Sequence, residues 1–340
     1  MKSFVLILSF LLFVSAITCI STNWRSDDEV IALYEEWLVK HQKLYSSLGE
    51  KIKRFEIFKD NLRYIDQQNH YNKVNHMNFT LGLNQFADLT LDEFSSIYLG
   101  TSVDYEQIIS SNPNHDDVEE DILKEDVVEL PDSVDWREKG VVFPIRNQGK
   151  CGSCWTFSAV ASIETLNGIK KGHMIALSEQ ELLDCETISQ GCKGGHYNNA
   201  FAYVAKNGIT SEEKYPYIFR QGQCYQKEKV VKISGYKRVP RNNGGQLQSA
   251  VAQQVVSVAV KCESKDFQFY DRGIFSGACG PILDHAVNIV GYGSKGGANY
   301  WIMRNSWGTN WGENGYMRIQ KNSKHYEGHC GIAMQPSYPV

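Results

Sequence analysis

The chain has 340 residues, of which 42% are apolar and 22% are charged, and its formal net charge is −4. This composition is that of globular proteins and argues against a largely disordered chain, while the length suggests more than one folded unit. The small net charge hides an asymmetry. Residues 130–340 hold 24 basic and 17 acidic residues, a net +7, which leaves −11 for residues 1–129. The acidic residues 1–129 and the basic residues 130–340 would attract each other. The alternative is that both sets of charges are ordinary solvent-exposed surface charges.

The first 20 residues have the pattern of a secretory signal peptide. Lys2 precedes an almost unbroken apolar run from Phe4 to Val14, and small residues follow at Ser15 and Ala16. The run is short for a membrane span. We therefore expect residues 1–20 to direct the chain into the secretory pathway, toward a vacuole, a lysosome-like compartment or the cell exterior. No later stretch is apolar enough for a transmembrane helix.

Residues 28–69 combine high charge with apolar residues at helical spacing, which predicts helices. Glu50 and Arg54 are placed for an i,i+4 ion pair, worth about 0.2–0.5 kcal/mol. Six residues of the second half fall on one helix face: Glu50, Arg54, Phe58, Asn61, Ile65 and Asn69. By itself this pattern also fits an amphipathic helix in any helical domain.

The segment that follows is less regular. Residues 82–88 predict a short strand or turn, and the sequon Asn78-Phe79-Thr80 before it makes Asn78 a candidate for N-glycosylation. Residues 101–129 lose periodicity and become acidic, which predicts an exposed linker open to proteolysis. A new folded unit then begins at Leu130-Pro131.

From Leu130 onward, helical patterns come first and strand patterns later. Helices are predicted over 154–170 and 178–185, the second with a capping box between Ser178 and Glu181. Alternating or apolar runs predict strands over 255–260, 286–292, 300–305 and 315–320. This order predicts an α+β fold of two subdomains, with a cleft between them as the natural ligand site.

The pair Cys151 and Cys154 is open to three chemistries. Cys154 stands where a helix is predicted to begin, and a helix N-terminus favours the reactive thiolate. A C-x-x-C is also a redox pair or half a zinc site. The zinc site lacks a second such pair, and the redox motif lacks its usual βαβ context.

The sequence Cys151-Gly152-Ser153-Cys154-Trp155 resembles the active-site signature of papain-like cysteine peptidases. His285 lies 131 residues after Cys154, and Asn305 lies 151 residues after it. The family places its His and Asn at about these distances. The six helix-face residues, together with Gly82, Asn84, Phe86 and Asp88, resemble two pro-region motifs of the cathepsin L-like branch. Leu130-Pro131 resembles the mature start of plant, papain- or ervatamin-like members.

This resemblance implies a papain-like fold with a helical left subdomain and an antiparallel β-barrel-like right subdomain. An N-terminal helical pro-domain would precede it. The implied division is a signal peptide (1–20), an inhibitory pro-region (21–129) and a mature cysteine peptidase domain (130–340). Within the pro-region, the inhibitor domain would cover about 33–90 and the acidic linker 101–129.

The resemblance also assigns catalytic roles. Cys154 would be the nucleophile, and His285 would take its proton and later protonate the leaving amine. Asn305 would orient the imidazole, with Trp307 shielding their hydrogen bond. Gln148 and the Cys154 backbone N–H would bind the oxyanion. The reaction would need neither a metal nor an organic cofactor.

Eight cysteines remain after Cys19, which lies at the signal cleavage region, and an even count suggests four bridges. The family pattern implies three instead: Cys151–Cys192, Cys185–Cys224 and Cys279–Cys330. Cys154 would stay free, and Cys262 would be a buried thiol at a strand end, with a redox or intermolecular role as the alternative.

The resemblance places the substrate in a cleft lined by Gly152, Ser153, Gly194, Gly195, His196, Tyr197, Ala259, Leu283, Asp284, Ala286, Trp307 and Gln335. The main specificity pocket would take an apolar or aromatic side chain two residues before the scissile bond. His196 and Gln335 depart from the commoner residues of the family. Nothing after Cys192 resembles the paired-His loop of carboxydipeptidase relatives, which favours an endopeptidase.

Expected partners are protein and peptide substrates, the chain's own pro-region as inhibitor, and cystatin-type inhibitors. The enzyme would be a monomer that binds neither nucleic acid nor membranes. A catalytically silent storage or inhibitor homologue is the alternative. It would require the loss of a catalytic residue, and Gln148, Cys154, His285 and Asn305 are all present.

Overall fold

The computed structural model describes residues 24–100 and 130–340. The expected signal peptide (1–20) and the acidic linker (101–129) lie outside the described residues. The chain divides into two compact units, Met1–Tyr64 and Ile65–Val340. No helix among the described residues is long and apolar enough to cross a membrane.

The first unit contains helix α2 (Asp27–Lys40) and the beginning of α3 (Leu48–Val74). The Ser26 side chain and Glu29 form a reciprocal capping box that starts α2. Apolar residues at helical spacing then bury one face, where the Phe58 ring packs 5.0 Å from Tyr34 and 5.4 Å from Trp37. Helices thus form over the two predicted runs, and Arg54 Nε lies 2.6 Å from Glu50 Oε1.

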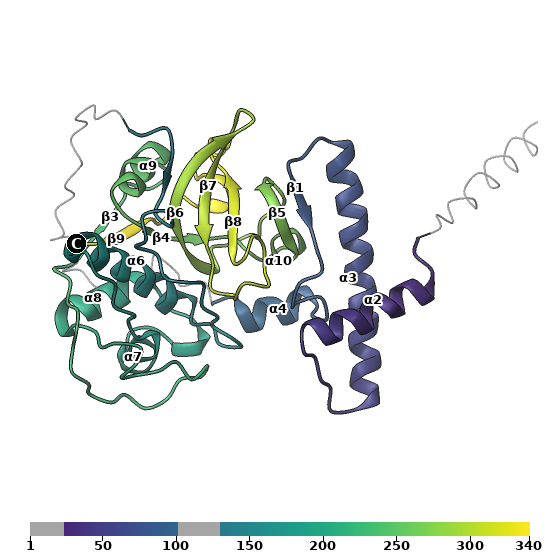
Figure 1. The fold of residues 1–340 in the computed structure, drawn as a ribbon, viewed down its shortest axis with the longest axis horizontal. Helices are drawn as coiled ribbons and strands as arrows, with labels where there is room; N and C mark the ends of the chain where they lie inside the picture. The colour runs from purple at the N-terminus through teal and green to yellow at the C-terminus, as the bar shows by residue number, and fades with distance from the viewer. Residues whose placement is uncertain (1–23, 101–129) are drawn as a thin grey trace, which may run out of the picture. The chain divides into compact units, whose positions relative to one another are not determined.

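The second unit begins within α3 and carries the remaining elements (Figure 1). Its helices are α4 (Leu91–Tyr98), α6 (Cys154–Lys171), α7 (Glu179–Cys185), α8 (Tyr197–Asn207), α9 (Gly244–Gln253) and α10 (Lys265–Gln268), with short 3-10 turns at Gly191–Lys193 and His329–Gly331. Its strands are β1 (Phe79–Leu81), β2 (Val134–Asp135), β3 (Tyr236–Arg238), β4 (Val256–Val260), β5 (Tyr270–Phe275), β6 (His285–Lys295), β7 (Ala298–Arg304), β8 (Tyr316–Gln320) and β9 (Ser337–Pro339).

The strands form one nine-stranded sheet in the order β1-β5-β8-β7-β6-β4-β9-β3, with β2 paired to β6. The expectation of an antiparallel, barrel-like sheet is wrong in two respects. The path does not close on itself, and β5 pairs with β8 in parallel. Pro-segment strand β1 pairs with β5 at one end of the sheet, and β3 pairs only with β9 at the other. The two end strands therefore have no partner to close a barrel.

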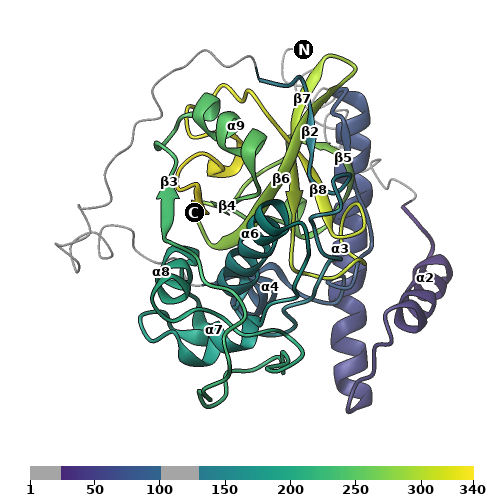
Figure 2. The ribbon, with the colours of Figure 1, turned by 60° about the vertical axis from the view of Figure 1, so that its left-hand side comes forward.

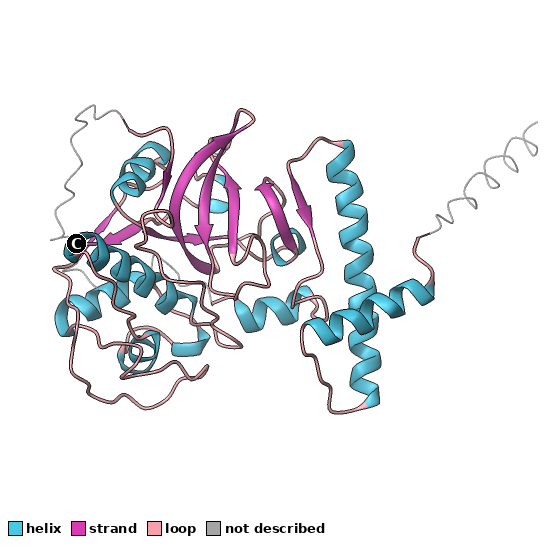
Figure 3. Ribbon diagram, in the orientation of Figure 1, coloured by secondary structure: helices cyan, strands magenta, loops and turns pink. Residues whose placement is uncertain are grey.

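Helices and strands separate within residues 130–340, as Figure 3 shows by colour. Helix α6 is buried along most of its length and lies across the sheet (Figure 2), packed against β4 and β6. Polar contacts fix this packing, because Asn288 Nδ2 donates to Ser158 O at 2.8 Å and Ser162 Oγ contacts Ser257 Oγ at 2.9 Å. The helix that begins at Cys154 is thereby held rigidly against the strand that begins at His285.

Three disulfides are present, and they are the pairs that the resemblance implies: Cys151–Cys192, Cys185–Cys224 and Cys279–Cys330. Cys154 and Cys262 are free and buried. The capping box predicted for α7 forms only in part. Ser178 Oγ accepts from Glu181 N–H, whereas the Glu181 carboxylate accepts from Thr210 N–H at 2.7 Å.

Candidate active site

Cys154 is the first residue of α6, and the loop before it is fixed by tight packing. A Cβ on Gly152 would lie 2.6 Å from the carbonyl oxygen of Cys192, so this position accepts only glycine. The Cys151–Cys192 disulfide joins the same two segments. The neighbouring Ser153 directs its hydroxyl to Tyr217 Oη at 2.7 Å. Sequence and packing together present the Cys154 thiol at a defined place.

His285 and Asn305 come together because β6 and β7 are antiparallel neighbours. His285 Nε2 donates to Asn305 Oδ1 at 2.8 Å, so Nδ1 is the nitrogen left to act as a base. The indole of Trp307 stacks over the imidazole, with ring centroids 4.5 Å apart. Trp307 is buried and so excludes water from one side of the His285–Asn305 bond.

Cys154 and His285 line the same cavity but share no hydrogen bond among the described residues. The Ala286 N–H donates to Cys154 Sγ at 3.4 Å. His285 Nδ1 is buried without a hydrogen-bond partner in the described part of the chain. The two side chains therefore lie at the same cavity without a hydrogen bond between them. Long or absent hydrogen bonds are common at catalytic sites before a substrate binds.

Burial controls the charge of both groups. It raises the pKa of Cys154 to about 11, an effect only partly offset by hydrogen bonds from the backbone of Ala286 and Gly100. Burial also lowers the pKa of His285 to about 4. Near pH 7 the precursor thus holds a neutral thiol beside a neutral imidazole. Burial of the Cys154 thiol in this structure thus opposes the thiolate that a helix N-terminus favours.

Gln148 is completely buried next to the loop that carries Cys154. Its Nε2 donates to Cys151 O at 2.9 Å and to Tyr98 O at 3.0 Å, and its Oε1 accepts from Ser306 Oγ at 2.7 Å. The acceptor Tyr98 belongs to the pro-segment. The amide that the resemblance assigns to the oxyanion is therefore occupied by a carbonyl oxygen of the chain itself.

The pro-segment reaches Cys154 at Gly100, a residue that the sequence motifs did not include. Gly100 lies beside the thiol, where a Cβ would be 3.5 Å from Cys154 Sγ and 3.5 Å from Gly194 Cα. Upstream, the rings of Phe86 and Phe94 contact the Trp307 indole edge-on, at centroid distances of 5.6 and 5.3 Å.

Polar contacts lock the same segment in place. Gln85 Nε2 donates to Trp307 O at 2.8 Å, and Asn84 Nδ2 donates to Gln268 O at 2.7 Å. Gln268 Nε2 in turn donates to the carbonyl oxygens of Phe86 and Leu89. Residues of the predicted motif 82–88 thus bind the peptidase part directly.

The expected specificity pocket forms as one small cavity beside Cys154. Its volume is about 30 Å³, and its lining is Gly100, Cys154, Gly195, His196, Tyr197, Ala259, Leu283, Asp284, His285, Ala286 and Gln335. The structure therefore brings together, on this one cavity, eight of the twelve residues that the resemblance places along the substrate cleft. Gly194, with φ 123°, precedes it in a backbone conformation that favours glycine.

Asp284 directly precedes His285 in the chain and holds a neighbouring loop. Its carboxylate accepts from Cys262 N–H at 2.8 Å and Glu263 N–H at 3.1 Å. Burial raises the pKa of Asp284 to about 7 despite these bonds. Cys262 is fully buried, and burial raises the pKa of its thiol, so it is an inert core thiol in this structure.

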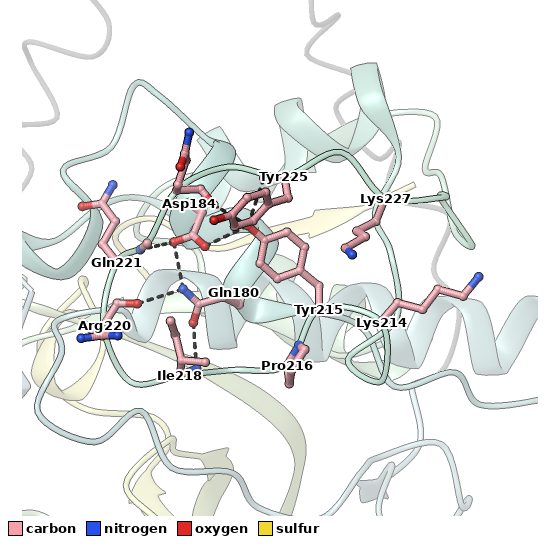
Figure 4. Close-up of a pocket in the computed structure, with 12 residues that line it drawn as sticks. Gln180, Asp184, Lys214, Tyr215, Pro216, Ile218, Arg220, Gln221, Tyr225 and Lys227 are labelled. Atoms are coloured by element: carbon pink, nitrogen blue, oxygen red, sulfur yellow. Dashed lines mark hydrogen bonds between the residues drawn. The ribbon is translucent and has the colours of Figure 1, made fainter.

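A second, larger cavity of about 530 Å³ contains none of the predicted catalytic residues (Figure 4). Gln180 and Asp184 line this cavity, and Gln180 forms hydrogen bonds with the loop that borders it. Gln180 Nε2 donates to Asp184 Oδ1 and to Arg220 O, and its Oε1 accepts from Ile218 N–H. These contacts hold the loop that ends at the Cys185–Cys224 disulfide, which makes the network structural.

Two family models match the chain. Residues 130–340 match the papain family cysteine proteases, and residues 34–94 match the cathepsin propeptide inhibitor domain. The chain belongs to the papain family of cysteine proteases. The match to the protease family begins at Leu130, and the match to the inhibitor domain begins within α2. Both ranges contain the sequence motifs on which the resemblance was based.

Plant relatives are similar over nearly the whole length. Caricain of Carica papaya is 49% identical, with 93% of this chain and 88% of the relative covered. Papaya proteinase 4 of the same plant is 46% identical at the same coverage. Among solved structures, the proform of the ragweed pollen allergen Amb a 11 has a TM-score of 0.82 at 36% identity, covering 93% of this chain and 95% of that one. A recombinant stem bromelain precursor has a TM-score of 0.80 at 39% identity, covering 92% and 99%.

This papain-family chain is thus a cysteine protease made as a proenzyme with a propeptide inhibitor domain. These two solved structures are of a proform and a precursor, and the similarity extends over more than nine-tenths of this chain. The propeptide acts as the inhibitor of the protease that follows it in the chain.

Proposed function

We propose that the processed enzyme is an endopeptidase that cleaves protein and peptide substrates through Cys154 and His285. The observation that carries this proposal is that Cys154 and His285 line one cavity with Gly100 of the pro-segment, while Gln148 Nε2 donates to the Tyr98 carbonyl two residues earlier. A polypeptide already lies against these groups in the precursor. A substrate backbone takes the same place once the pro-segment has left.

The chemistry follows from the positions of the side chains. Without the pro-segment, water reaches Cys154 and His285, and proton transfer from the thiol to Nδ1 yields a thiolate–imidazolium pair. Asn305 keeps the imidazole oriented through Nε2. The thiolate attacks the scissile carbonyl, the imidazolium protonates the leaving amine, and water hydrolyses the thioester that remains.

Gln148 Nε2 and the Cys154 backbone N–H stabilise the oxyanion of each tetrahedral intermediate. In the precursor, Gln148 Nε2 already binds a carbonyl oxygen, that of Tyr98, which supports this role. The substrate chain runs in extended form past Gly194 and Gly195, whose missing side chains let two backbones approach. Leu283, Ala259 and Ala286 supply apolar contacts for the side chain two residues before the scissile bond.

The setting of the enzyme is part of the proposal. The signal-like residues 1–20 and three disulfides fit the secretory pathway, with a vacuole-like compartment or secretion as the destination. The proenzyme would be cut within the acidic linker 101–129, which releases a monomeric mature domain open to cystatin-type inhibitors. Asn78 is exposed and available for glycosylation.

An active-site label tests the proposal. The epoxide E-64, seen bound to bromelain and to a Carica candamarcensis cysteine protease, should modify Cys154 of the acid-processed enzyme and abolish peptide hydrolysis. Peptide mapping of the labelled chain identifies the residue. Hydrolysis that persists in a Cys154→Ala variant would refute the mechanism, and a processed wild type without activity would favour a silent storage or inhibitor protein.

A further inference from the structure

The cavity beside Cys154 is too small for a large side chain. Its volume is about 30 Å³, close to the space that one water molecule occupies. A cavity that binds benzene is about five times larger, roughly 150 Å³. Pro-segment residue Gly100 lines the open side. The inner wall consists of peptidase residues, which the processed enzyme retains.

His196 forms one part of this wall and is locked in orientation. It precedes α8 as its N-cap, where its Nδ1 accepts from Asn198 N–H at 3.1 Å. Nδ1 is therefore unprotonated, and Nε2 donates to Gln335 Oε1 at 3.0 Å. The side chain is 6% exposed, and burial lowers its pKa to about 4. Both ring nitrogens are engaged, so a rotation of the ring would break two hydrogen bonds.

Tyr197 and Gln335 complete the wall. Tyr197 is 1% exposed, its ring lies 4.2 Å from that of His196, and its hydroxyl donates to the backbone carbonyl of Gln335. Tyr197 and His196 thus both bind Gln335. The Tyr197 hydroxyl binds its backbone carbonyl, and the His196 ring binds its side chain. The three side chains come from two distant segments and brace each other, so the cavity cannot widen through one rotamer change.

An extended substrate would place one particular side chain in this cavity. In an extended chain, alternate side chains point to opposite sides. With the scissile carbonyl at Cys154 and the backbone along Gly194 and Gly195, the side chain that faces Ala259 and Gln335 belongs to the residue two before the scissile bond.

We propose that His196, Tyr197 and Gln335 restrict the enzyme to small side chains at this substrate position, such as Ala or Val, and exclude aromatic ones. This inference rests on the proposed function and narrows the apolar or aromatic preference expected from the sequence. Gln335 is the selectivity residue most open to test, because its backbone carbonyl, the partner of Tyr197, survives replacement of its side chain.

The experiment compares four fluorogenic peptides that differ only two residues before the cleaved bond, with Ala, Val, Leu or Phe there and Arg next to the bond. The processed wild-type enzyme should show a kcat/KM for Ala and Val at least tenfold above that for Phe. Gln335→Ala should raise the ratio of the Phe value to the Ala value at least tenfold. Ala259→Val, which narrows the cavity instead, should reduce the value for Val more than that for Ala. Gln226→Ala, the same change at an exposed site, is the matched control.

The outcomes separate the selectivity from the proposed function. An enzyme that E-64 labels at Cys154 and that cleaves the Phe peptide as well as the Val peptide overturns the selectivity alone. So does a Gln335→Ala enzyme with an unchanged profile. An enzyme that cleaves none of the four peptides and takes up no label overturns the proposed function together with the selectivity.

Discussion

The side-chain amide of Gln148 donates a hydrogen bond to the main-chain carbonyl of Tyr98, 3.0 Å away. A residue expected to stabilise the transition state is thus occupied by the inhibitor segment. The same stretch places Gly100 beside Cys154. On the proposed mechanism, inhibition therefore acts on the oxyanion donor Gln148 and on the nucleophile Cys154 together, and both become available when one segment leaves.

Replacement of Gln148 by Ala in the processed enzyme should lower kcat by about 10²–10³, because one oxyanion donor is lost. KM should change little, since the hydrogen bond strengthens in the transition state. Steady-state kinetics with one peptide measure both values, and Gln226→Ala serves as the control. A fall in kcat of less than threefold would remove Gln148 from the oxyanion site.

Phe94→Ala should weaken latency. The Phe94 ring is fully buried against Phe86 and Trp307, and buried Phe→Ala changes cost about 3–5 kcal/mol. About 1.4 kcal/mol, roughly a third of that cost, already weakens the binding of the pro-segment tenfold. The rate of self-processing at pH 5, followed by gel, should rise at least tenfold. Tyr71→Ala, at an exposed ring on α3, is the control. Equal rates in the two variants would contradict the importance of this contact.

Acid should destabilise the precursor through His285. Its folded pKa, about 4, lies below that of an unfolded histidine, about 6.5, so the unfolded state takes up the proton first. This contribution to stability is complete above pH 6.5 and is lost as the pH falls toward 4, at up to about 1.4 kcal/mol per pH unit. In a Cys154→Ala background, which prevents processing, adding His285→Gln should flatten the fall in the free energy of unfolding. Parallel curves in denaturant titrations at several pH values would argue against it.

The processed enzyme should contain two thiols of very different reactivity. Cys154 faces the substrate cavity, whereas Cys262 is fully buried with a raised pKa. A disulfide-exchange reagent such as DTNB should find one thiol in the native enzyme and two after denaturation without reductant. Cys154→Ala should reduce these counts to none and one. A native Cys262 that reacts rapidly would restore the redox role that the sequence left open.

The sequence predicted what depends on local pattern. Apolar periodicity located α6 and the strands β4, β6, β7 and β8, but not β5. The spacing of Cys154, His285 and Asn305 predicted a catalytic centre, and the structure places Cys154 and His285 on one cavity. Properties that depend on burial by distant segments were not predictable. The thiol pKa is one, because it reflects a pro-segment residue, Gly100, placed on Cys154 by tertiary packing. The small volume of the cavity is another, since it results from the mutual bracing of His196 and Gln335, 139 residues apart.

Strand β1 has a consequence for the enzyme after processing. It pairs with β5, where Ile274 N–H donates to Asn78 O at 2.7 Å. Departure of the pro-segment leaves this side of β5 as an open edge with unpaired backbone groups, a template for association between molecules. Asp271 and Arg272 lie on that edge as an ion pair at 3.2 Å, and charges there oppose strand addition. The pro-segment therefore covers this edge in the precursor, and after processing the charges of Asp271 and Arg272 oppose the addition of a strand from another molecule.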